Sequence, residues 1–347
     1  MMVVLGFVYL IPLMMSGPLL DDIWSGFDKS CNHVWWWVAT MTHNYQHVVP
    51  EYVRRQVVKC MPHYWYVSVD FQLIIGASLL LTVLPRWPKQ SLWFAGAVTV
   101  ASALYTVIHT YVGGYYPTAL VISTDIQKLF DTADNIYMKP YSHAGPVAVG
   151  IIFGWLAVQR HKLSRLVQAA CWAVATAVGL TCLFSIWSWN HNWNPTGWGP
   201  ILYGGLHRTA WALVVNWLLY VCVTGRGGPV GRLLEWAPFY PLGRLSFGLY
   251  LVHVVVLGCN IMSMRDRKSE QGFLQIQYFI GAAAMSYIFA YILYVTIEAP
   301  IAHLDNLLFG FTKRYKKENQ SEGSQQVHSQ CNGNHREVFV LTDSKPQ

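Results

Sequence analysis

The chain has 347 residues, of which 54% are hydrophobic, 15% aromatic and only 12% charged. A soluble domain carries roughly a quarter charged residues, so this chain has too few charges to cover a water-facing surface. Its 16 Trp, 20 Tyr and 15 Phe exclude a disordered chain. The formal net charge of +7 does not indicate a nucleic-acid partner, because the basic residues lie in short clusters between apolar runs and near the C-terminus. The composition therefore predicts an integral membrane protein.

A transmembrane helix needs about 20 mostly apolar residues. Windows of that size predict an all-α, polytopic transmembrane helix bundle with about eight membrane helices. The expected spans are residues 1–15, 65–84, 91–111, 145–158, 169–189, 200–224, 242–262 and 273–298. The first and the fourth are short. We find no regular alternation of polar and apolar residues over about ten positions, which argues against an outer-membrane barrel.

The chain divides into two parts. Residues 1–311 form the predicted transmembrane domain, and residues 312–347, rich in Gln, Ser, Asn and Lys, predict a disordered cytosolic tail. Basic residues are enriched in cytosolic loops, and most of those here fall on one side if the N-terminus is cytosolic. The cluster at residues 265–268 is the exception. We expect a multi-pass protein of the plasma membrane or the endoplasmic reticulum.

Two of the seven cysteines, Cys31 and Cys60, fall in the same long loop, residues 16–64. That loop is expected on the non-cytosolic side, where disulfides form, so we expect the two cysteines to pair. The bridge would close a loop of about 30 residues and contribute roughly 3 kcal/mol in the chain-entropy model. No Cys/His set has the spacing of a zinc site, and we expect no bound metal.

Ionisable side chains within membrane helices are costly and often mark a site or a pathway. Asp70, His109, His207 and Arg208 are all predicted in the outer half of the bilayer. Asp70 and Arg208 are the expected charge partners, either for chemistry or to fix helix register. The histidines can exchange a proton near neutral pH, although a membrane histidine is more often a hydrogen-bonded residue of the bundle.

The seventh predicted span carries a second group of polar residues. Tyr250 and His253 are three positions apart and share a helical face, with His253 near mid-membrane. Arg244 lies at the cytosolic end of this span, level with Glu298 at the end of the last one. We expect Arg244 and Glu298 to pair, more as a structural clasp than as a catalytic pair.

Several runs of the sequence together resemble the nose-resistant-to-fluoxetine proteins, animal members of the acyltransferase-3 membrane family. The resemblance covers about residues 10 to 310. Each run is weak alone, but their order makes the assignment fairly specific. The runs are Cys60-Met-Pro-His-Tyr-Trp65-Tyr-Val-Ser-Val-Asp70-Phe-Gln72, Asn135-Ile-Tyr-Met-Lys139-Pro140-Tyr141, Leu245-Ser246-Phe247-Gly-Leu-Tyr250-Leu-Val-His253, and Glu298-Ala299-Pro300 with Leu304.

The resemblance implies an integral-membrane acyltransferase that moves an acyl group from a cytosolic donor, with acyl-CoA as co-substrate and no bound cofactor, to a hydroxylated or lipid-like acceptor. Such a reaction needs a base for the acceptor hydroxyl and donors for the carbonyl oxygen. The family's first helices carry a catalytic His and an R-x-x-R pair, and no residue of this chain can be matched to them. In the second run His143 and Val147 stand where the family has Arg and Tyr. We therefore expect a truncated gene model or a member that has lost catalysis.

The expected site combines residues selected by membrane depth with residues from these runs. As catalytic candidates we name His253, Asp70 and Arg208, and as substrate-binding candidates Gln72, Lys139, Tyr250, His207 and Glu298. The expected partners are membrane lipid, an acyl donor and a small hydroxylated or lipid acceptor, without nucleic acid. The alternative is a non-catalytic membrane protein that transports or binds lipids or xenobiotics.

Overall fold

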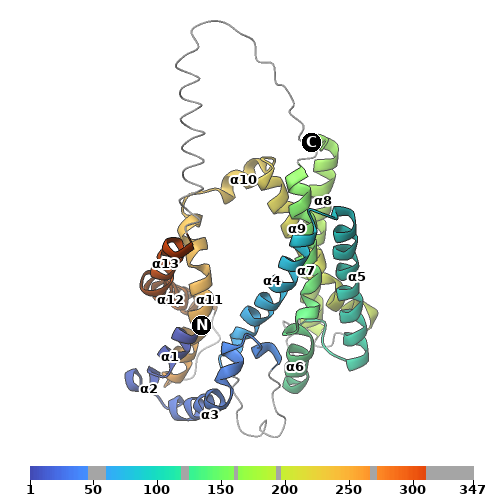
Figure 1. Ribbon diagram of the computed structural model, residues 1–347. Coiled ribbons are helices and arrows are strands. Elements are labelled where there is room, and N and C mark those ends of the chain that lie inside the picture. The colour runs from blue at the N-terminus through green and yellow to red at the C-terminus, as the bar shows by residue number, and fades with distance from the viewer. Residues whose placement is uncertain (46–59, 119–124, 160–162, 193–196, 266–271, 310–347) are drawn as a thin grey trace, which may run out of the picture.

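The computed structural model describes residues 1–45, 60–118, 125–159, 163–192, 197–265 and 272–309 (Figure 1). Every regular element in these ranges is a helix, so the predicted all-α class is confirmed. The predicted tail, residues 312–347, lies outside the described ranges.

Six helices in the described ranges are long and apolar enough to cross a bilayer. They contain, in chain order, α4 (Trp65–Val83), α5 (Pro88–Gly113), α8 (Arg165–Asn192), α9 (Trp198–Val223), α11 (Phe239–Met262) and α12 (Gly272–Leu293). The protein is thus an integral membrane protein with a helical bundle, and these helices match six of the eight expected spans.

The other two expected spans differ from the prediction. Residues 1–15 form two short helices, α1 (Met2–Val8) and α2 (Ile11–Met14), because Pro12 in the first turn of α2 has no N–H to continue the helix. The fourth expected span is α7 (Ala144–Gln159), which is apolar but has only 16 residues. The expected count of eight is therefore not confirmed.

The long helices form two groups joined by α4 (Figure 1). In one group α5, α7 and α9 pack on one another and α8 packs on α9, while α11 and α12 pair in the other. Small residues permit the close contact of α5 with α9: a Cβ at Gly205 would lie 2.2 Å from Cγ2 of Val107. Membrane helices commonly use such residues where their backbones approach.

The segment expected as a loop before α4 contains a further 20-residue helix, α3 (Leu20–Ala39). Its buried residues Leu20, Phe27, Cys31 and Val38 follow helical spacing and form one apolar stripe. The stripe packs with α1 and α11 into one buried core. The prediction of a loop over residues 16–64 is therefore wrong for this part of the segment.

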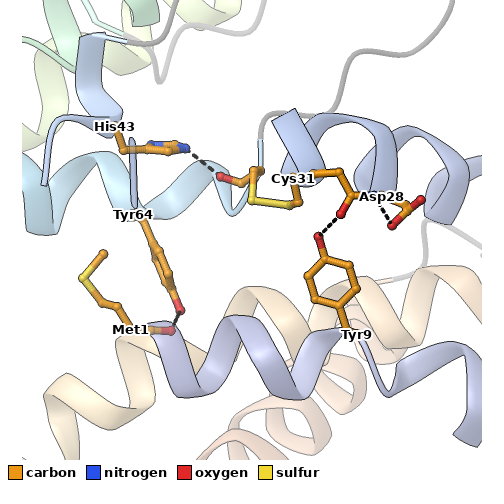
Figure 2. Close-up of a disulfide and its surroundings, with 8 residues drawn as sticks. Met1, Tyr9, Asp28, Cys31, His43 and Tyr64 are labelled. Carbon is orange, nitrogen blue, oxygen red and sulfur yellow. Dashed lines mark hydrogen bonds between the residues drawn. A yellow bond between two sulfur atoms is a disulfide. The ribbon is translucent and has the colours of Figure 1, made fainter. Parts of the chain in front are cut away.

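The expected disulfide is present and ties α3 to the start of α4 (Figure 2). Cys31 and Cys60 are fully buried, and their Cα atoms lie 4.7 Å apart. Nε2 of His43 donates to the Cys60 carbonyl oxygen at 2.6 Å, and the Tyr64 hydroxyl donates to the Met1 carbonyl oxygen at 3.3 Å (Figure 2). These contacts hold α1, α3 and the 3-10 turn η3 (Pro62–Tyr64) against one another.

Short elements complete the fold. They are η1 (His43–Tyr45), α6 (Ile126–Thr132), the π-helical turn η4 (Ala133–Tyr137), η5 (Pro140–Ser142), α10 (Gly228–Leu234), the π-helical turn η6 (Tyr294–Glu298) and α13 (Ala299–Phe309). Two of them, η4 and η5, lie in the segment that leads into α7, next to α4 and α5.

Candidate functional site

Three of the runs that carried the family resemblance meet at the N-terminal end of α4. Nε2 of His63 in η3 donates to the Leu251 carbonyl oxygen of α11 at 3.1 Å. On the other side of the same turn, the Trp65 ring lies 4.7 Å from the ring of Tyr137 in η4. The beginning of α4 is therefore placed between α11 and the segment before α7.

On the α11 side, His63, Tyr250 and His253 form a compact cluster. The Tyr250 hydroxyl donates to the His63 carbonyl oxygen, and Nδ1 of His253 donates to the Tyr250 carbonyl oxygen at 2.7 Å. The rings of His63 and His253 lie 5.7 Å apart, centroid to centroid. Tyr66 adds an aromatic wall, with its ring 5.3 Å from that of Tyr250.

In the neutral form of each ring, the hydrogen bonds determine which nitrogen carries the lone pair. A carbonyl oxygen only accepts, so Nε2 of His63 and Nδ1 of His253 must carry hydrogen. The remaining nitrogens, Nδ1 of His63 and Nε2 of His253, then carry lone pairs. This arrangement provides two potential proton acceptors on neighbouring rings.

Sequence reasoning missed His63, because it placed this residue in the loop before the helix. His63 is only 8% exposed, and its Nδ1 is buried without a hydrogen-bond partner. Such an atom is uncommon in folded proteins and calls for a structural or functional explanation. The signal that could have identified it is its place inside the Cys60–Gln72 run, one turn before an apolar helix.

A second cluster surrounds Arg208 of α9. Its guanidinium lies 5.9 Å from the centre of the Tyr137 ring and donates to the Gly204 carbonyl oxygen at 3.1 Å. Nε2 of His143 donates to the Tyr137 carbonyl oxygen at 2.8 Å. His207 stacks on Tyr203 of its own helix, with ring centroids 4.6 Å apart. Tyr137 and Trp65 thus connect the Arg208 cluster to the start of α4.

His143 lies between η5 and α7, outside the membrane-spanning helices. Burial lowers its pKa to about 4, and the nearby Arg208 charge adds to this effect, against the opposing influence of the hydrogen bond to Tyr137. His143 is therefore neutral near pH 7. This residue stands where the resemblance expects an arginine, and as a neutral ring it adds no second positive charge beside Arg208.

The expected ion pair between Asp70 and Arg208 is not formed, and both residues are in the described part of the chain. Asp70 is exposed on α4, one turn beyond Tyr66. Arg208 instead contacts Tyr137 and its own helix backbone. The position of a residue in the sequence gives its depth along the helix axis. It does not give the rotation of the helix, which decides toward which neighbouring helix the side chain points.

Gln72 and Lys139, expected as substrate-binding residues, both hold the turn after α3. Nε2 of Gln72 donates to the Met41 carbonyl oxygen at 2.8 Å and to Oδ1 of Asn44 at 2.9 Å. The ammonium of the buried Lys139 donates to the Asn44 carbonyl oxygen at 3.1 Å and lies 5.1 Å from the centre of the Tyr45 ring. Both side chains therefore stabilise the turn after α3, beside the His253 and Arg208 clusters.

Arg244 and Glu298 are both exposed, and among the described residues they form no ion pair with each other. The Arg244 guanidinium lies 5.5 Å from the centre of the Tyr294 ring and donates to the Tyr240 hydroxyl at 3.4 Å. The expected Arg244–Glu298 pair is therefore not formed, and Arg244 instead contacts Tyr294 of η6.

His109 belongs to neither cluster. Its ring stacks on that of Tyr105 at 5.4 Å and lies 5.5 Å from the Tyr115 ring, near the end of α5. Within the described ranges, no group of three or more His, Cys, Asp or Glu side chains is placed to hold a metal ion.

Comparison with known proteins adds three findings. A family model described as "Acyltransferase domain" matches residues 3–295. The chain is 28% identical over 306 residues to "Nose resistant to fluoxetine protein 6" of Caenorhabditis elegans, covering 84% of this chain and 36% of that protein. It is 23% identical over 324 residues to "Regulator of hypoxia-inducible factor 1" of the same organism, covering 86% of this chain and 59% of that protein. The chain thus spans less than two thirds of the length of either relative, and no solved structure matches it.

Proposed function

Because the chain belongs to the acyltransferase-3 membrane family, we propose that it transfers an acyl group, other than an aminoacyl group, to a hydroxylated or lipid-like acceptor. The donor is a cytosolic thioester such as acyl-CoA. The observation that carries the proposal is the hydrogen bond from Nδ1 of His253 to the Tyr250 carbonyl oxygen, because in the neutral ring it leaves the lone pair on Nε2.

In the proposed reaction His253 acts as the general base. Its Nε2 takes the proton from the acceptor hydroxyl while the acceptor oxygen attacks the thioester carbonyl carbon. The carbon–sulfur bond then breaks, and His253 returns the proton to the leaving thiolate sulfur. The histidine is unchanged after one turnover, so proton and charge balance without a bound cofactor.

Arg208 is proposed to stabilise the negative charge that develops on the carbonyl oxygen. Its guanidinium donors suit this role, and Tyr137 links its cluster to the start of α4. Tyr250 and His207 are proposed to line the acceptor path beside these groups. Asp70, exposed on a membrane helix, is proposed to mark a hydrated side of α4 through which a polar acceptor approaches, because a carboxylate in hydrocarbon is costly. Glu298 is proposed to contact the donor at the cytosolic end.

The test uses the full chain in phosphatidylcholine nanodiscs with acyl-CoA and a panel of hydroxylated acceptors. Release of the CoA thiol is followed with a thiol reagent. His253→Ala should abolish acceptor-dependent release, whereas His303→Ala, at an exposed position of α13, should leave it unchanged. Turnover that survives His253→Ala at the wild-type rate would remove His253 from the mechanism.

The second candidate is a membrane protein that binds or transports lipids or xenobiotics without chemistry. One observation favours it: Gln72 and Lys139, two residues expected to bind substrate, are engaged in scaffold contacts. This function predicts no thiol release by the wild-type chain with any acceptor of the panel, together with lipids that remain bound after purification.

A further inference from the structure

Arg208 is a cation inside a membrane helix, and no carboxylate of the described ranges pairs with it. The ionisable groups close enough to interact with its charge are two tyrosines and two histidines, Tyr137, Tyr203, His143 and His207. Charged side chains within membrane proteins nearly always have a partner of opposite charge. A buried charge without such compensation is strongly destabilising. Arg208 therefore requires a counter-ion that no described side chain supplies.

The guanidinium of Arg208 has hydrogen-bond donors to spare. An arginine carries five N–H groups, and here Nη1 donates to the Gly204 carbonyl oxygen at 3.1 Å. Nε and Nη2 have no acceptor among the described residues, yet neither atom is fully buried. These two nitrogens present parallel N–H bonds along one edge, which is the arrangement that binds both oxygens of a carboxylate.

The surroundings of Arg208 supply a single positive charge. His143 is neutral near pH 7, because burial lowers its pKa to about 4. A positive charge on His207 would be repelled by the adjacent guanidinium. Lys139, the cation of the segment before α7, is engaged with the Asn44 carbonyl oxygen. A phosphate monoester carries nearly two negative charges at pH 7, so the single cation matches a monoanion such as a carboxylate better.

The depth of Arg208 argues against the phosphate of a lipid head group, although a phosphodiester is also a monoanion. Arg208 is the eleventh residue of α9, which places it roughly 15 Å along the helix from Trp198. This distance is half the roughly 30 Å of a bilayer's hydrocarbon core, whereas lipid phosphates lie outside that core. A small acid is therefore the better match.

His253, the proposed base, lies at the same depth as Arg208. It precedes Met262, the last residue of α11, by nine positions, or roughly 14 Å. The aromatic residues between the two groups are also close, since the Tyr137 hydroxyl interacts electrostatically with that of Tyr250. A molecule held by Arg208 is thus at the level at which the proposed base acts.

We propose that Nε and Nη2 of Arg208 bind the carboxylate of a small hydroxylated monocarboxylic acid. The inference rests on the proposed function in one respect, because it takes this acid to be the acyl acceptor. The N–H groups that remain on Nη1 and Nη2 are still available to the carbonyl oxygen during acyl transfer. The single charge at Arg208 selects this acid over phosphorylated and neutral acceptors.

The experiment compares three molecules with the same carbon skeleton. Glycerate, glycerol 3-phosphate and glycerol carry one, nearly two and no negative charges at pH 7.5. Binding of radiolabelled glycerate to the full chain in phosphatidylcholine nanodiscs is measured by equilibrium dialysis, without acyl-CoA. We expect saturable binding that glycerol 3-phosphate displaces about tenfold less effectively than unlabelled glycerate, and that glycerol does not displace. Absence of saturable binding, or equal displacement by glycerol 3-phosphate or chloride, would overturn the proposal.

Arg208→Gln should weaken glycerate binding about tenfold or more. The matched control is Arg244→Gln, at an exposed position of α11, which should bind as the wild type does. Equal binding by the two variants would refute the site. If Arg208→Gln does not fold, as judged by gel filtration, Arg208→Lys replaces it with the same expectation, because lysine keeps the charge but lacks the paired donors.

His143→Arg tests the argument from charge by a gain of binding. It places a second cation beside Arg208 and should reverse the preference, so that glycerol 3-phosphate binds more tightly than glycerate. A misfolded protein would not gain this preference. Retention of the wild-type preference by folded His143→Arg would refute the argument from charge.

This test and the test of acyl transfer can fail separately. Glycerate binding without release of the CoA thiol would support the site and contradict the proposed acyl transfer. Release of the thiol with glycerol as acceptor, without glycerate binding, would support acyl transfer and overturn the acidic acceptor.

Discussion

Adding one methyl group at Gly205 tests whether the contact of α5 with α9 determines the stability of the larger helix group. A Cβ at this position would lie 2.2 Å from Cγ2 of Val107, 2.9 Å from the Ala103 carbonyl oxygen and 3.0 Å from the Val107 amide nitrogen. The Val107 side chain can rotate away, but two of the three atoms belong to the α5 backbone and cannot. Gly205→Ala must therefore separate the helices by several tenths of an ångström, at a cost of about 1–3 kcal/mol.

The matched control is Gly199→Ala in the same helix, because a Cβ at Gly199 has no neighbour within 4 Å. Both variants gain the same methyl group, so the difference between their free energies of unfolding isolates the cost of the α5–α9 contact. Stepwise SDS denaturation of the purified proteins, followed by circular dichroism, measures this difference. Equal unfolding curves for Gly205→Ala and Gly199→Ala would refute the reasoning. Arg208 lies one turn from Gly205, so the separation should also lower any acyl-transfer rate of Gly205→Ala.

Three further predictions concern other parts of the molecule. The Cys31→Ser/Cys60→Ser double variant should lose about 3–4 kcal/mol of stability, because the bridge closes a 29-residue separation; an unchanged unfolding curve would argue against a stabilising bridge. Because the folded pKa of His143 is about 4 and its ordinary value is 6.5, the unfolded chain takes up the proton first as the pH falls. Stability should then decrease by up to about 3 kcal/mol between pH 6.5 and 4, and His143→Gln should flatten this decrease; an identical pH profile in both proteins would contradict the assignment. Lys139→Met should lower stability by about 1–3 kcal/mol through the lost hydrogen bond to Asn44, with unchanged KM for acyl-CoA. A raised KM for acyl-CoA at unchanged stability would instead support a role of Lys139 in substrate binding.

The long apolar helices could be predicted because length and hydropathy suffice for a span. The bounds of α4, α5, α9 and α11 lie within three residues of the expected ends. Helix α3 was not predicted, because its charged residues and its Trp35–Trp37 run lower its hydropathy below that of a span. Its amphipathic stripe was the available signal.

The site was only partly predictable for a different physical reason. Sequence position gives the level of a residue along a helix, but the rotation of that helix is set by packing with its neighbours. Tyr250 and His253 were expected on one face and do lie in one cluster, since both belong to a single helix. Asp70 and Arg208 lie on different helices, and their expected contact failed. Arg244 lies near the segment in which its partner was expected, but the residue that it contacts there is Tyr294.

The Cys31–Cys60 bridge also bears on how the protein matures in the cell. Cys60 lies three residues before His63, so the bridge ties the turn that carries this histidine to α3, while the His63 side chain itself bonds to α11. A newly made chain still in its dithiol form can insert its hydrophobic helices while this anchor is missing. Formation of the bridge would then be a step separate from membrane insertion, and it would precede assembly of the histidine pair.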